Sequence, residues 1–203
     1  MDATTKTISE QLYRRAQRVM PGGVSRNTVL RRPYPSYAAR GEGCRVTDVD
    51  GNVRIDFANN MASLIHGHAH PKIVEAVTEQ LHRGSAFTMT TEQELEFAEY
   101  MVARVPNFGK IRFVNSGTEA VMSCVKAARA YTGRSKIAKV EGSYHGIYDY
   151  VEVSQTSTPQ NWGASTHPAR NPVAQGTPQG AIDDVVIIPF NDPEVALAIL
   201  DQH

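Results

Sequence analysis

The sequence has little of what would tie a protein to a secretory, membrane or nucleic-acid setting. Its two cysteines, Cys44 and Cys124, stand far apart and favour free thiols of a cytosolic protein over a disulfide. No apolar run approaches the roughly 20 residues of a membrane span, and the first residues lack the apolar core of a secretory leader. Basic and acidic side chains balance at 21 each, so no surplus charge attracts nucleic acid or a lipid surface. We therefore expect a cytoplasmic protein with neither as a partner.

The sequence also lacks the fingerprints of common nucleotide and metal sites. Neither Gly-x-x-x-x-Gly-Lys-Ser/Thr nor Gly-x-Gly-x-x-Gly is present. The three histidines at 66, 68 and 70 have no carboxylate or cysteine at a familiar ligand spacing, and Pro71 fixes the chain directly after them. We expect a helix entry there and no metal site. Any bound phosphate should be a single compact group.

The residues that are present alternate between helical and strand patterns. Apolar spacing predicts helices over 8–19, 71–83, 92–105, 117–132 and 193–202. Short apolar or alternating runs predict strands over 44–49, 53–57, 111–114, 137–140 and 185–188, and the first two join in a hairpin. Residues 24–43 have the composition of an extended, irregular segment, and 154–181 that of a long loop that covers a site or is disordered. The alternation is typical of an α/β domain with a mostly parallel sheet.

Residues 111–119 combine a predicted strand, a turn and a helix start. Ser116 and Glu119 form the Ser-x-x-Glu pattern of a capping box, which opens a helix. Gly117 lies between them, and its lack of a Cβ lets a ligand approach the backbone. A strand that enters a helix through such a turn leaves unpaired N–H groups at the positive end of the helix dipole, which suits a phosphate. An ordinary capped helix is the alternative.

Tyr144 and His145 follow another predicted strand and are flanked by Gly142 and Gly146. Ligands of parallel sheets bind beyond the carboxyl ends of strands, and both glycine-bearing turns fall there. An aromatic ring in that position could stack on a planar heteroaromatic ligand. Aromatic residues that only fill a loop are the alternative.

Arg26 is a candidate substrate contact. It belongs to a basic run that follows a Gly-Gly turn. Its guanidinium suits bidentate recognition of a substrate carboxylate, whereas nucleic-acid binding would need more surplus charge over the whole chain. A solvated arginine is the alternative.

The order of these segments resembles the class III pyridoxal-phosphate-dependent aminotransferases. The resemblance rests on Pro21-Gly-Gly-Val-Ser25, Asp48-Val-Asp-Gly-Asn52, Gly67-His-Ala-His-Pro71, Asn115-Ser-Gly-Thr-Glu-Ala120 and Tyr144-His-Gly146. Each motif is weak alone, but the combination over residues 10–150 is specific. The glutamate-1-semialdehyde 2,1-aminomutase branch and the related β-amino-acid transaminases are the most similar.

The resemblance implies fold type I of the pyridoxal-phosphate-dependent transferases, an α/β fold, in an enzyme that is a homodimer. Residues 1–60 would hold the N-terminal helix, the extended arm and the β-hairpin, as part of the small domain. Residues 61–203 would form the first part of the cofactor-binding large domain, with a mostly parallel sheet that is incomplete.

The resemblance also implies roles for single residues. Ser116, Gly117 and Thr118 would seat the phosphate of pyridoxal 5'-phosphate. Tyr144 would stack on the pyridine ring, with His145 beside it. Arg26 resembles the N-terminal arginine that grips the substrate carboxylate in the β-amino-acid transaminases.

Two departures from the family pattern bear on activity. Asn60-Met61-Ala62-Ser63 stands where aminomutases carry Ser-Trp-Gly-Pro, so the tryptophan of that branch's substrate pocket is missing. The family's Schiff-base lysine, and the aspartate that pairs with the pyridine nitrogen, lie beyond the equivalent of residue 203. None of the six lysines here, at positions 6, 72, 110, 126, 136 and 139, occupies a matching context.

The sequence thus predicts a transaminase that moves an amino group from an amino acid to a keto acid or aldehyde. It would be present as an N-terminal fragment without a catalytic residue and without turnover of its own. A glutamate-1-semialdehyde 2,1-aminomutase is one alternative. A non-catalytic module that binds a phosphorylated ligand is another.

Overall fold

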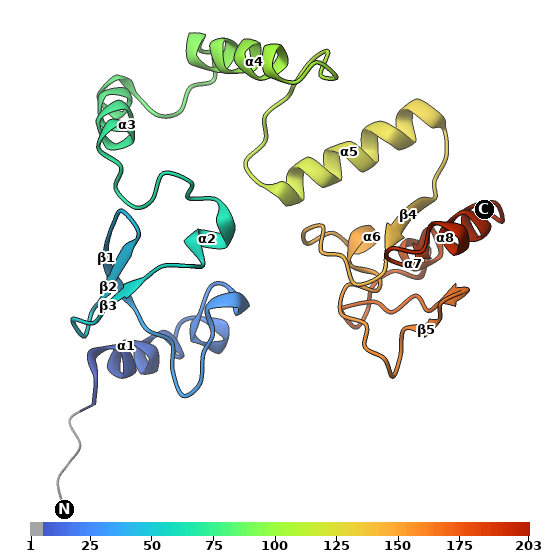
Figure 1. Ribbon diagram of the computed structural model, residues 1–203, viewed down its shortest axis with the longest axis horizontal. Coiled ribbons are helices and arrows are strands. Elements are labelled where there is room, and N and C mark those ends of the chain that lie inside the picture. The colour runs from blue at the N-terminus through green and yellow to red at the C-terminus, as the bar shows by residue number, and fades with distance from the viewer. Residues whose placement is uncertain (1–5) are drawn as a thin grey trace, which may run out of the picture. The chain divides into compact units, whose positions relative to one another are not determined.

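Figure 1 shows the computed structural model of the chain, which describes residues 6–203. The chain divides into two compact units, one up to Thr91 and one from Glu92 to His203. Each unit has its own elements and its own local contacts. The domain boundary expected after residue 60 stays a prediction.

Helix α1 (Ile8–Ala16) opens the first unit and confirms the helix predicted there, although it ends earlier than residue 19. Thr7 caps it, because the hydroxyl oxygen accepts a hydrogen bond from the Glu10 N–H at 3.1 Å. The Asp50 carboxylate accepts from the Ile8 N–H at 2.6 Å. A residue of the hairpin turn therefore satisfies one of the helix's free donors.

A three-stranded antiparallel sheet follows two short 3-10 turns, η1 (Pro21–Gly23) and η2 (Asn27–Val29). The predicted hairpin is confirmed as β2 (Arg45–Asp48) and β3 (Val53–Ile55). The strand β1 (Ala38–Glu42) adds to it within a segment that the sequence predicted as irregular, so that prediction is wrong there. Ala-Ala-Arg-Gly-Glu carries no apolar alternation that would indicate a strand.

Asp48 at the end of β2 fastens the hairpin. Its buried carboxylate accepts from the Asn52 N–H at 2.8 Å and is paired with the Arg54 guanidinium. These hydrogen bonds, with that of Arg54 the strongest, lower the pKa of the Asp48 carboxyl from 3.8 to about 2. Because the folded-state pKa is the lower one, the carboxylate contributes stability that is fully present above about pH 4. That contribution is lost as the pH falls toward about 2.

Asp48→Asn should therefore flatten the acid dependence of stability. We expect the urea midpoint of the unsubstituted chain to fall between about pH 4 and pH 2, and that of the variant to fall less, because the amide cannot be protonated in this range. Asp149→Asn is the control, since Asp149 is exposed and its side chain has no hydrogen bond within residues 6–203. Equal acid slopes for Asp48→Asn and the unsubstituted chain would contradict this account.

The first unit ends in a left-handed turn and a helix. The residues Asn59–Ala62, labelled α2, have φ values of 47° to 62°, an uncommon conformation for non-glycine residues. Helix α3 (Pro71–Arg83) is confirmed, with its proline at the first helical position and Gly84 just beyond its end. His68 Nε2 lies 2.8 Å from Asp56 Oδ2, and this contact is the main cause that lowers the pKa of the Asp56 carboxyl.

The second unit is built on a parallel pair of strands, as predicted. β4 (Ile137–Val140) and β7 (Val185–Ile188) pair in register from Ile137 opposite Val185 to Val140 opposite Ile188. A small apolar core lies against them. Its buried members are Val153, Val185 and Ile187, and its partly buried members are Ile137, Tyr150 and Ile182.

The helices of the second unit confirm three predictions, and four short elements that were not predicted occur beside them, two helices and two strands. The predicted helices are α4 (Glu92–Arg104), α5 (Gly117–Thr132) and α8 (Pro193–Leu200). Helix α6 (Asp149–Glu152) precedes the predicted long loop. Within that loop lie β5 (Gly163–Ala164) and β6 (His167–Pro168), and α7 (Gln179–Asp183) begins in it and extends beyond residue 181. The long segment is therefore partly ordered by short-range hydrogen bonds.

The strand predicted at 111–114 is absent, which corrects the sequence analysis. No strand of the described chain pairs with this run, and a strand is held only by hydrogen bonds to a neighbour. Phe113 is 37% exposed and stacks on Phe97 of α4, with ring centroids 5.3 Å apart. The apolar run leads into α5 without belonging to the sheet.

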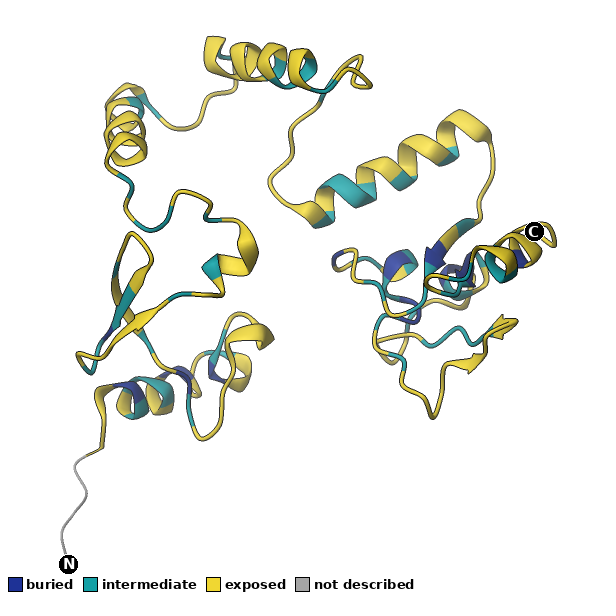
Figure 2. Cartoon of the chain, viewed as in Figure 1, coloured by how far each residue is buried: buried dark blue, intermediate teal, exposed yellow. Residues whose placement is uncertain are grey.

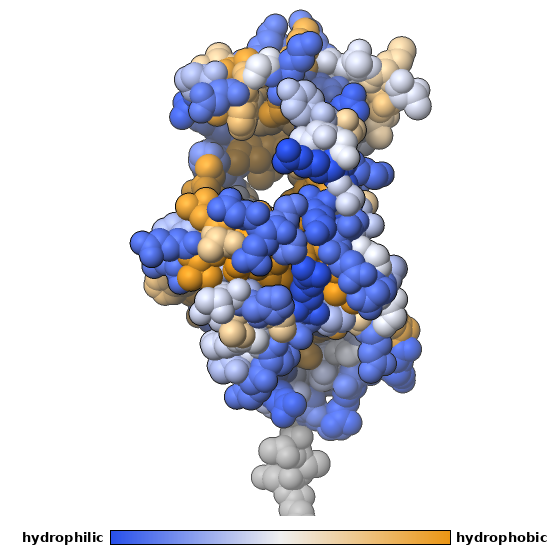
Figure 3. Space-filling model, turned by 90° about the vertical axis from the view of Figure 1, so that its right-hand side faces the viewer, coloured by the Kyte–Doolittle hydropathy of each residue, from blue (hydrophilic) through white to orange (hydrophobic). Residues whose placement is uncertain are grey.

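Several apolar helix faces are open to solvent. Figure 2 draws α3 and α4 largely in the exposed colour, and Figure 3 shows hydrophobic side chains uncovered on the face that it presents. Four residues of α3 are 45–59% exposed: Ile73, Val74, Val77 and Leu81. Within residues 6–203, no helix has the length and apolar character needed to cross a membrane.

Candidate functional site

The first turn of α5 carries the predicted capping box. Ser116 Oγ accepts from the Glu119 N–H at 3.2 Å, and the Glu119 carboxylate accepts from the Asn115 N–H at 2.7 Å. The N–H groups of Ser116, Gly117 and Thr118 have no hydrogen-bond partner within the described chain. They lie at the positive end of a 16-residue helix, an arrangement that binds phosphate.

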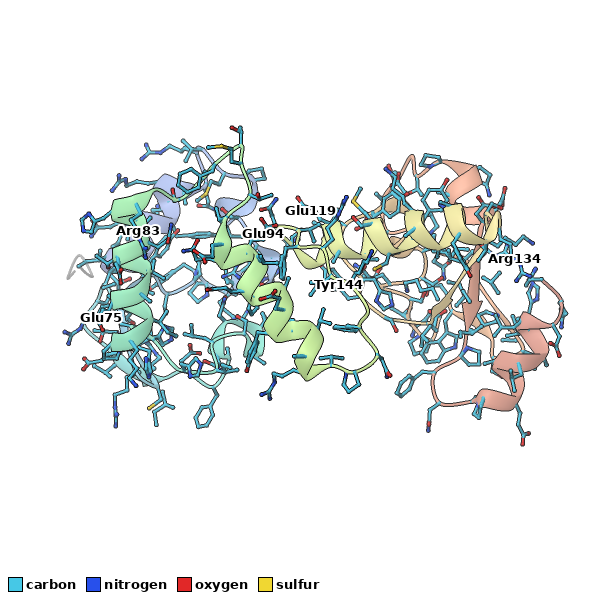
Figure 4. All side chains as sticks on the ribbon, turned by 90° about the horizontal axis from the view of Figure 1, so that it is seen from above. Glu75, Arg83, Glu94, Glu119, Arg134 and Tyr144 are labelled. Atoms are coloured by element: carbon cyan, nitrogen blue, oxygen red, sulfur yellow. The ribbon has the colours of Figure 1, made fainter. Side chains whose placement is uncertain are left out.

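The loop that carries Tyr144 and His145 is held against this first turn. The Ile147 N–H donates to Thr118 Oγ1 at 3.2 Å. Gly146 has a φ of +96°, and a Cβ there would lie 2.8 Å from Thr118 Cα, so only glycine permits this approach. Figure 4 shows Tyr144 near the end of α5 at which Glu119 lies. The structure thus brings together two turns that belong to separate motifs of the sequence.

A pocket of about 440 Å³ lies between the two turns. Its lining consists of Ser116, Gly117, Thr118, Val121, Tyr144, His145 and Gly146. All five residues predicted as cofactor contacts are among them. Val121 was assigned to the inner face of the helix by its apolar character, but its position one turn after Gly117 and Thr118 also places it at the pocket. The volume lies within the ~300–1,000 Å³ typical of small-molecule sites.

The pocket has space and chemistry for a phosphorylated aromatic ring. Gly117 lines the pocket, and a Cβ there would meet no atom within 4 Å, so the space beside this residue is open. The hydroxyl oxygens of Ser116 and Thr118 accept hydrogen bonds and keep their O–H groups free to donate. Tyr144 is 66% exposed, so its ring is accessible for stacking. These features fit pyridoxal 5'-phosphate.

Arg26, the predicted substrate contact, belongs to the first unit. Its guanidinium donates to Asn60 Oδ1 at 3.2 Å, and Asn60 Nδ2 donates to Ser63 Oγ at 3.0 Å. Asn60 has a φ of 48°, which asparagine tolerates better than most residues. Met61, at the family's tryptophan position, follows it and is 73% exposed. The role of Arg26 toward a substrate stays a prediction.

Lys139 on β4 is a buried lysine, 3% exposed. Burial lowers the pKa of its ammonium, and the Glu141 carboxylate acts in the opposite direction. Its Nζ donates to the Val140 carbonyl oxygen at 3.2 Å. A lowered pKa favours the nucleophilic amine, but Lys139 does not line the pocket between the two turns.

Comparison with known proteins places the chain in a family. The family described as Aminotransferase class-III matches residues 28–196. The glutamate-1-semialdehyde 2,1-aminomutase of Methanothermobacter thermautotrophicus is 45% identical over 193 residues, which make up 95% of this chain and 44% of the relative. The chain therefore spans less than half the length of this curated relative.

Two solved structures share the fold. An omega-transaminase from Sphaerobacter thermophilus is 50% identical with a TM-score of 0.94, over 98% of this chain and 45% of its own. A transaminase with PLP bound is also 50% identical, with a TM-score of 0.88, over 98% of this chain and 46% of its own. These likenesses confirm the predicted fold, a partial α/β domain of fold type I. With residues 28–196 matched, the chain belongs to the class III aminotransferases, the family whose cofactor is pyridoxal phosphate.

Proposed function

We propose that these residues are the N-terminal part of a pyridoxal-phosphate-dependent transaminase. The enzyme would transfer an amino group from an amino acid to a keto acid or aldehyde. The observation that carries the proposal is the pocket at the first turn of α5, where free N–H groups and the Tyr144 ring share one cavity. We assign Ser116, Gly117 and Thr118 to the phosphate, and Tyr144 and His145 to the ring.

The residues of this chain would bind and orient the cofactor. The free N–H groups and the helix dipole would offset the phosphate charge, and Tyr144 would stack on the ring and shield it from water. Arg26 is assigned to the substrate carboxylate through a bidentate pair. When bound, pyridoxal phosphate supplies an electron sink for bonds at the carbon that carries the amino group.

We propose that the reacting lysine and its partner aspartate lie in a part of the protein that follows these residues. The chain corresponds to 44% of the aminomutase and 45% of the omega-transaminase. The unpaired run Ile111–Val114 and the exposed face of α3 suit a protein with further elements to pack against them. No turnover is expected from the 203 residues alone.

The main alternative is that the longer protein is a glutamate-1-semialdehyde 2,1-aminomutase. The relative that is 45% identical carries this name. Met61 in place of the tryptophan favours a transaminase. The longer protein separates the two reactions. A transaminase needs a separate amino acceptor, whereas an aminomutase moves the group within one molecule, so formation of a new amino acid from an added keto acid would favour our assignment.

We also propose a homodimer for the longer protein, a cytoplasmic location and small-molecule donors and acceptors as partners. Both cysteines are free thiols, which suits a reducing compartment. The balanced charge offers no surface for nucleic acid.

Borohydride reduction tests where the chemistry lies. The chain is incubated with pyridoxal 5'-phosphate, reduced, digested and mapped by mass spectrometry. We expect low, scattered labelling and no single preferred lysine, because no lysine of residues 6–203 lines the pocket. The Lys139→Gln variant is the control, because Lys139 is the buried lysine with the lowered pKa. A stoichiometric adduct on any one lysine would contradict the claim that the reacting lysine lies elsewhere, and its loss in that variant would assign it to Lys139.

A further inference from the structure

Ser154 joins three segments of the second unit. It is fully buried, and its φ of +54° is uncommon for a residue with a side chain. Its Oγ donates to the Ala169 carbonyl oxygen at 2.6 Å and accepts from the Asn171 N–H at 3.0 Å. Its N–H donates to the Asn171 carbonyl oxygen at 2.6 Å. The hydroxyl and the N–H of Ser154 thus both form hydrogen bonds with the short segment 169–171.

The remaining polar group of Ser154 reaches the candidate site. Its carbonyl oxygen accepts a hydrogen bond from the Gly142 N–H at 2.9 Å. Gly142 begins the loop that carries Tyr144 and His145, and the far end of that loop is docked on Thr118. The loop is therefore held at both ends, by Ser154 at Gly142 and by α5 at its other end.

The segment that Ser154 contacts is held together by hydrogen bonds of its own. Asn171 Nδ2 donates to the Asn161 carbonyl oxygen at 2.7 Å and to Ser157 Oγ at 3.2 Å. The Asn161 side chain accepts from the Thr158 N–H at 2.7 Å. Hydrogen bonds among residues 154–171 thus fix the conformation of this segment and, with it, the position of Ser154.

We propose that Ser154 is a positioning residue, which holds the Gly142–Gly146 loop so that Tyr144 can cover the cofactor ring. The inference rests on the proposed cofactor site. Ser154 lines neither wall of the pocket, and it acts through Gly142. Loss of its hydroxyl would leave the Ala169 carbonyl and the Asn171 N–H without their partner. The backbone of residue 154, whose carbonyl oxygen accepts from the Gly142 N–H, would then be held less firmly. Within residues 6–203, the residues Ser116–Thr118 have no hydrogen bond to Ser154, Ala169 or Asn171, so the phosphate site would keep its geometry.

The test compares two probes, pyridoxine 5'-phosphate and inorganic phosphate, by calorimetry or phosphorus NMR. Pyridoxine 5'-phosphate keeps the ring and the phosphate but has no aldehyde to react with lysines. Ser154→Ala should weaken pyridoxine 5'-phosphate binding by about fivefold or more and change phosphate binding by less than about twofold. A general loss of structure would weaken both probes together.

Ser135→Ala is the matched control, because Ser135 Oγ donates to Asp184 Oδ1 at 3.0 Å beyond the other end of α5. It should leave both affinities unchanged. Ser154→Gly is the second variant, since glycine accepts the positive φ and lacks the whole side chain, hydroxyl included. It should bind as weakly as Ser154→Ala. Trp162 lies within the hydrogen-bonded segment 154–171, and its fluorescence reports whether each variant keeps its local fold.

Each outcome decides a separate claim. Undiminished pyridoxine 5'-phosphate binding by Ser154→Ala would overturn the positioning role. Full affinity in Ser154→Gly would overturn it as well, because the loss of affinity in Ser154→Ala would then arise from the backbone conformation and not from the missing hydroxyl. Parallel loss of both probes would reduce Ser154 to a general structural residue. If the unsubstituted chain binds pyridoxine 5'-phosphate no better than phosphate, the proposed cofactor site fails and this inference fails with it.

Discussion

Replacement of Gly146 by alanine should lower the affinity for pyridoxine 5'-phosphate by about tenfold or more, which is ~1.4 kcal/mol. The added Cβ would lie 2.8 Å from Thr118 Cα, a backbone atom that cannot give way without moving the helix. The φ of +96° adds strain for any residue with a side chain. The loop would have to leave the first turn of α5, and Tyr144 would leave the phosphate seat with it. Isothermal titration calorimetry measures the loss directly.

Gly176→Ala provides the matched control for this substitution. Gly176 lies in the same unit, outside the loop and the pocket, with a φ of +84°, and a Cβ there would meet no atom within 4 Å. It shares the conformational strain and lacks the clash, so its effect on affinity should be clearly smaller. Equal losses in the two variants would show that docking on Thr118 does not matter for binding.

Replacement of Gly117 by alanine should separate binding from stability. A Cβ at this position would meet no atom within 4 Å, and alanine is the better helix former. We expect the free energy of unfolding to stay equal or to rise, by at most ~1 kcal/mol. The affinity for inorganic phosphate and for pyridoxine 5'-phosphate should fall by about tenfold, because Gly117 lines the pocket and an added methyl group would take up part of its space.

Gly180→Ala is the control for this second substitution. Gly180 lies in helix α7, and a Cβ there would also meet no atom within 4 Å. It should change stability in the same direction and leave both affinities unaltered. Urea unfolding and calorimetry on the same samples give both quantities. If Gly117→Ala binds as tightly as the unsubstituted chain, the phosphate seat lies elsewhere.

The parts of the structure that could be predicted are those set by neighbouring residues. The capping box of Ser116 and Glu119 and the left-handed Gly133 at the end of α5 act within one helix turn, so the sequence pattern contains the whole interaction. The hairpin of β2 and β3 is likewise specified by its turn residues. The family resemblance added the cofactor and the candidate residues for its contacts.

The parts that could not be predicted depend on distant partners. Residues 111–114 have the composition of a strand but pair with no strand of the described chain. Strand β1 lacks the apolar pattern of a strand but pairs with β2. The contact of Gly146 with Thr118 joins two separate motifs, and neither motif specifies the distance between them. Ser154 gives no sequence signal, because its left-handed conformation is imposed by the surrounding hydrogen bonds.

The most direct test of the proposed cofactor site is the amide NMR spectrum of the isotope-labelled chain during titration with pyridoxine 5'-phosphate. The account predicts that the largest shifts arise at the Ser116, Gly117 and Thr118 amides, with further changes at Tyr144 and His145. Pyridoxine without its phosphate should leave the three seat amides unmoved. Saturable shifts confined to other residues, with these five unchanged, would contradict the assignment of the cofactor to this pocket.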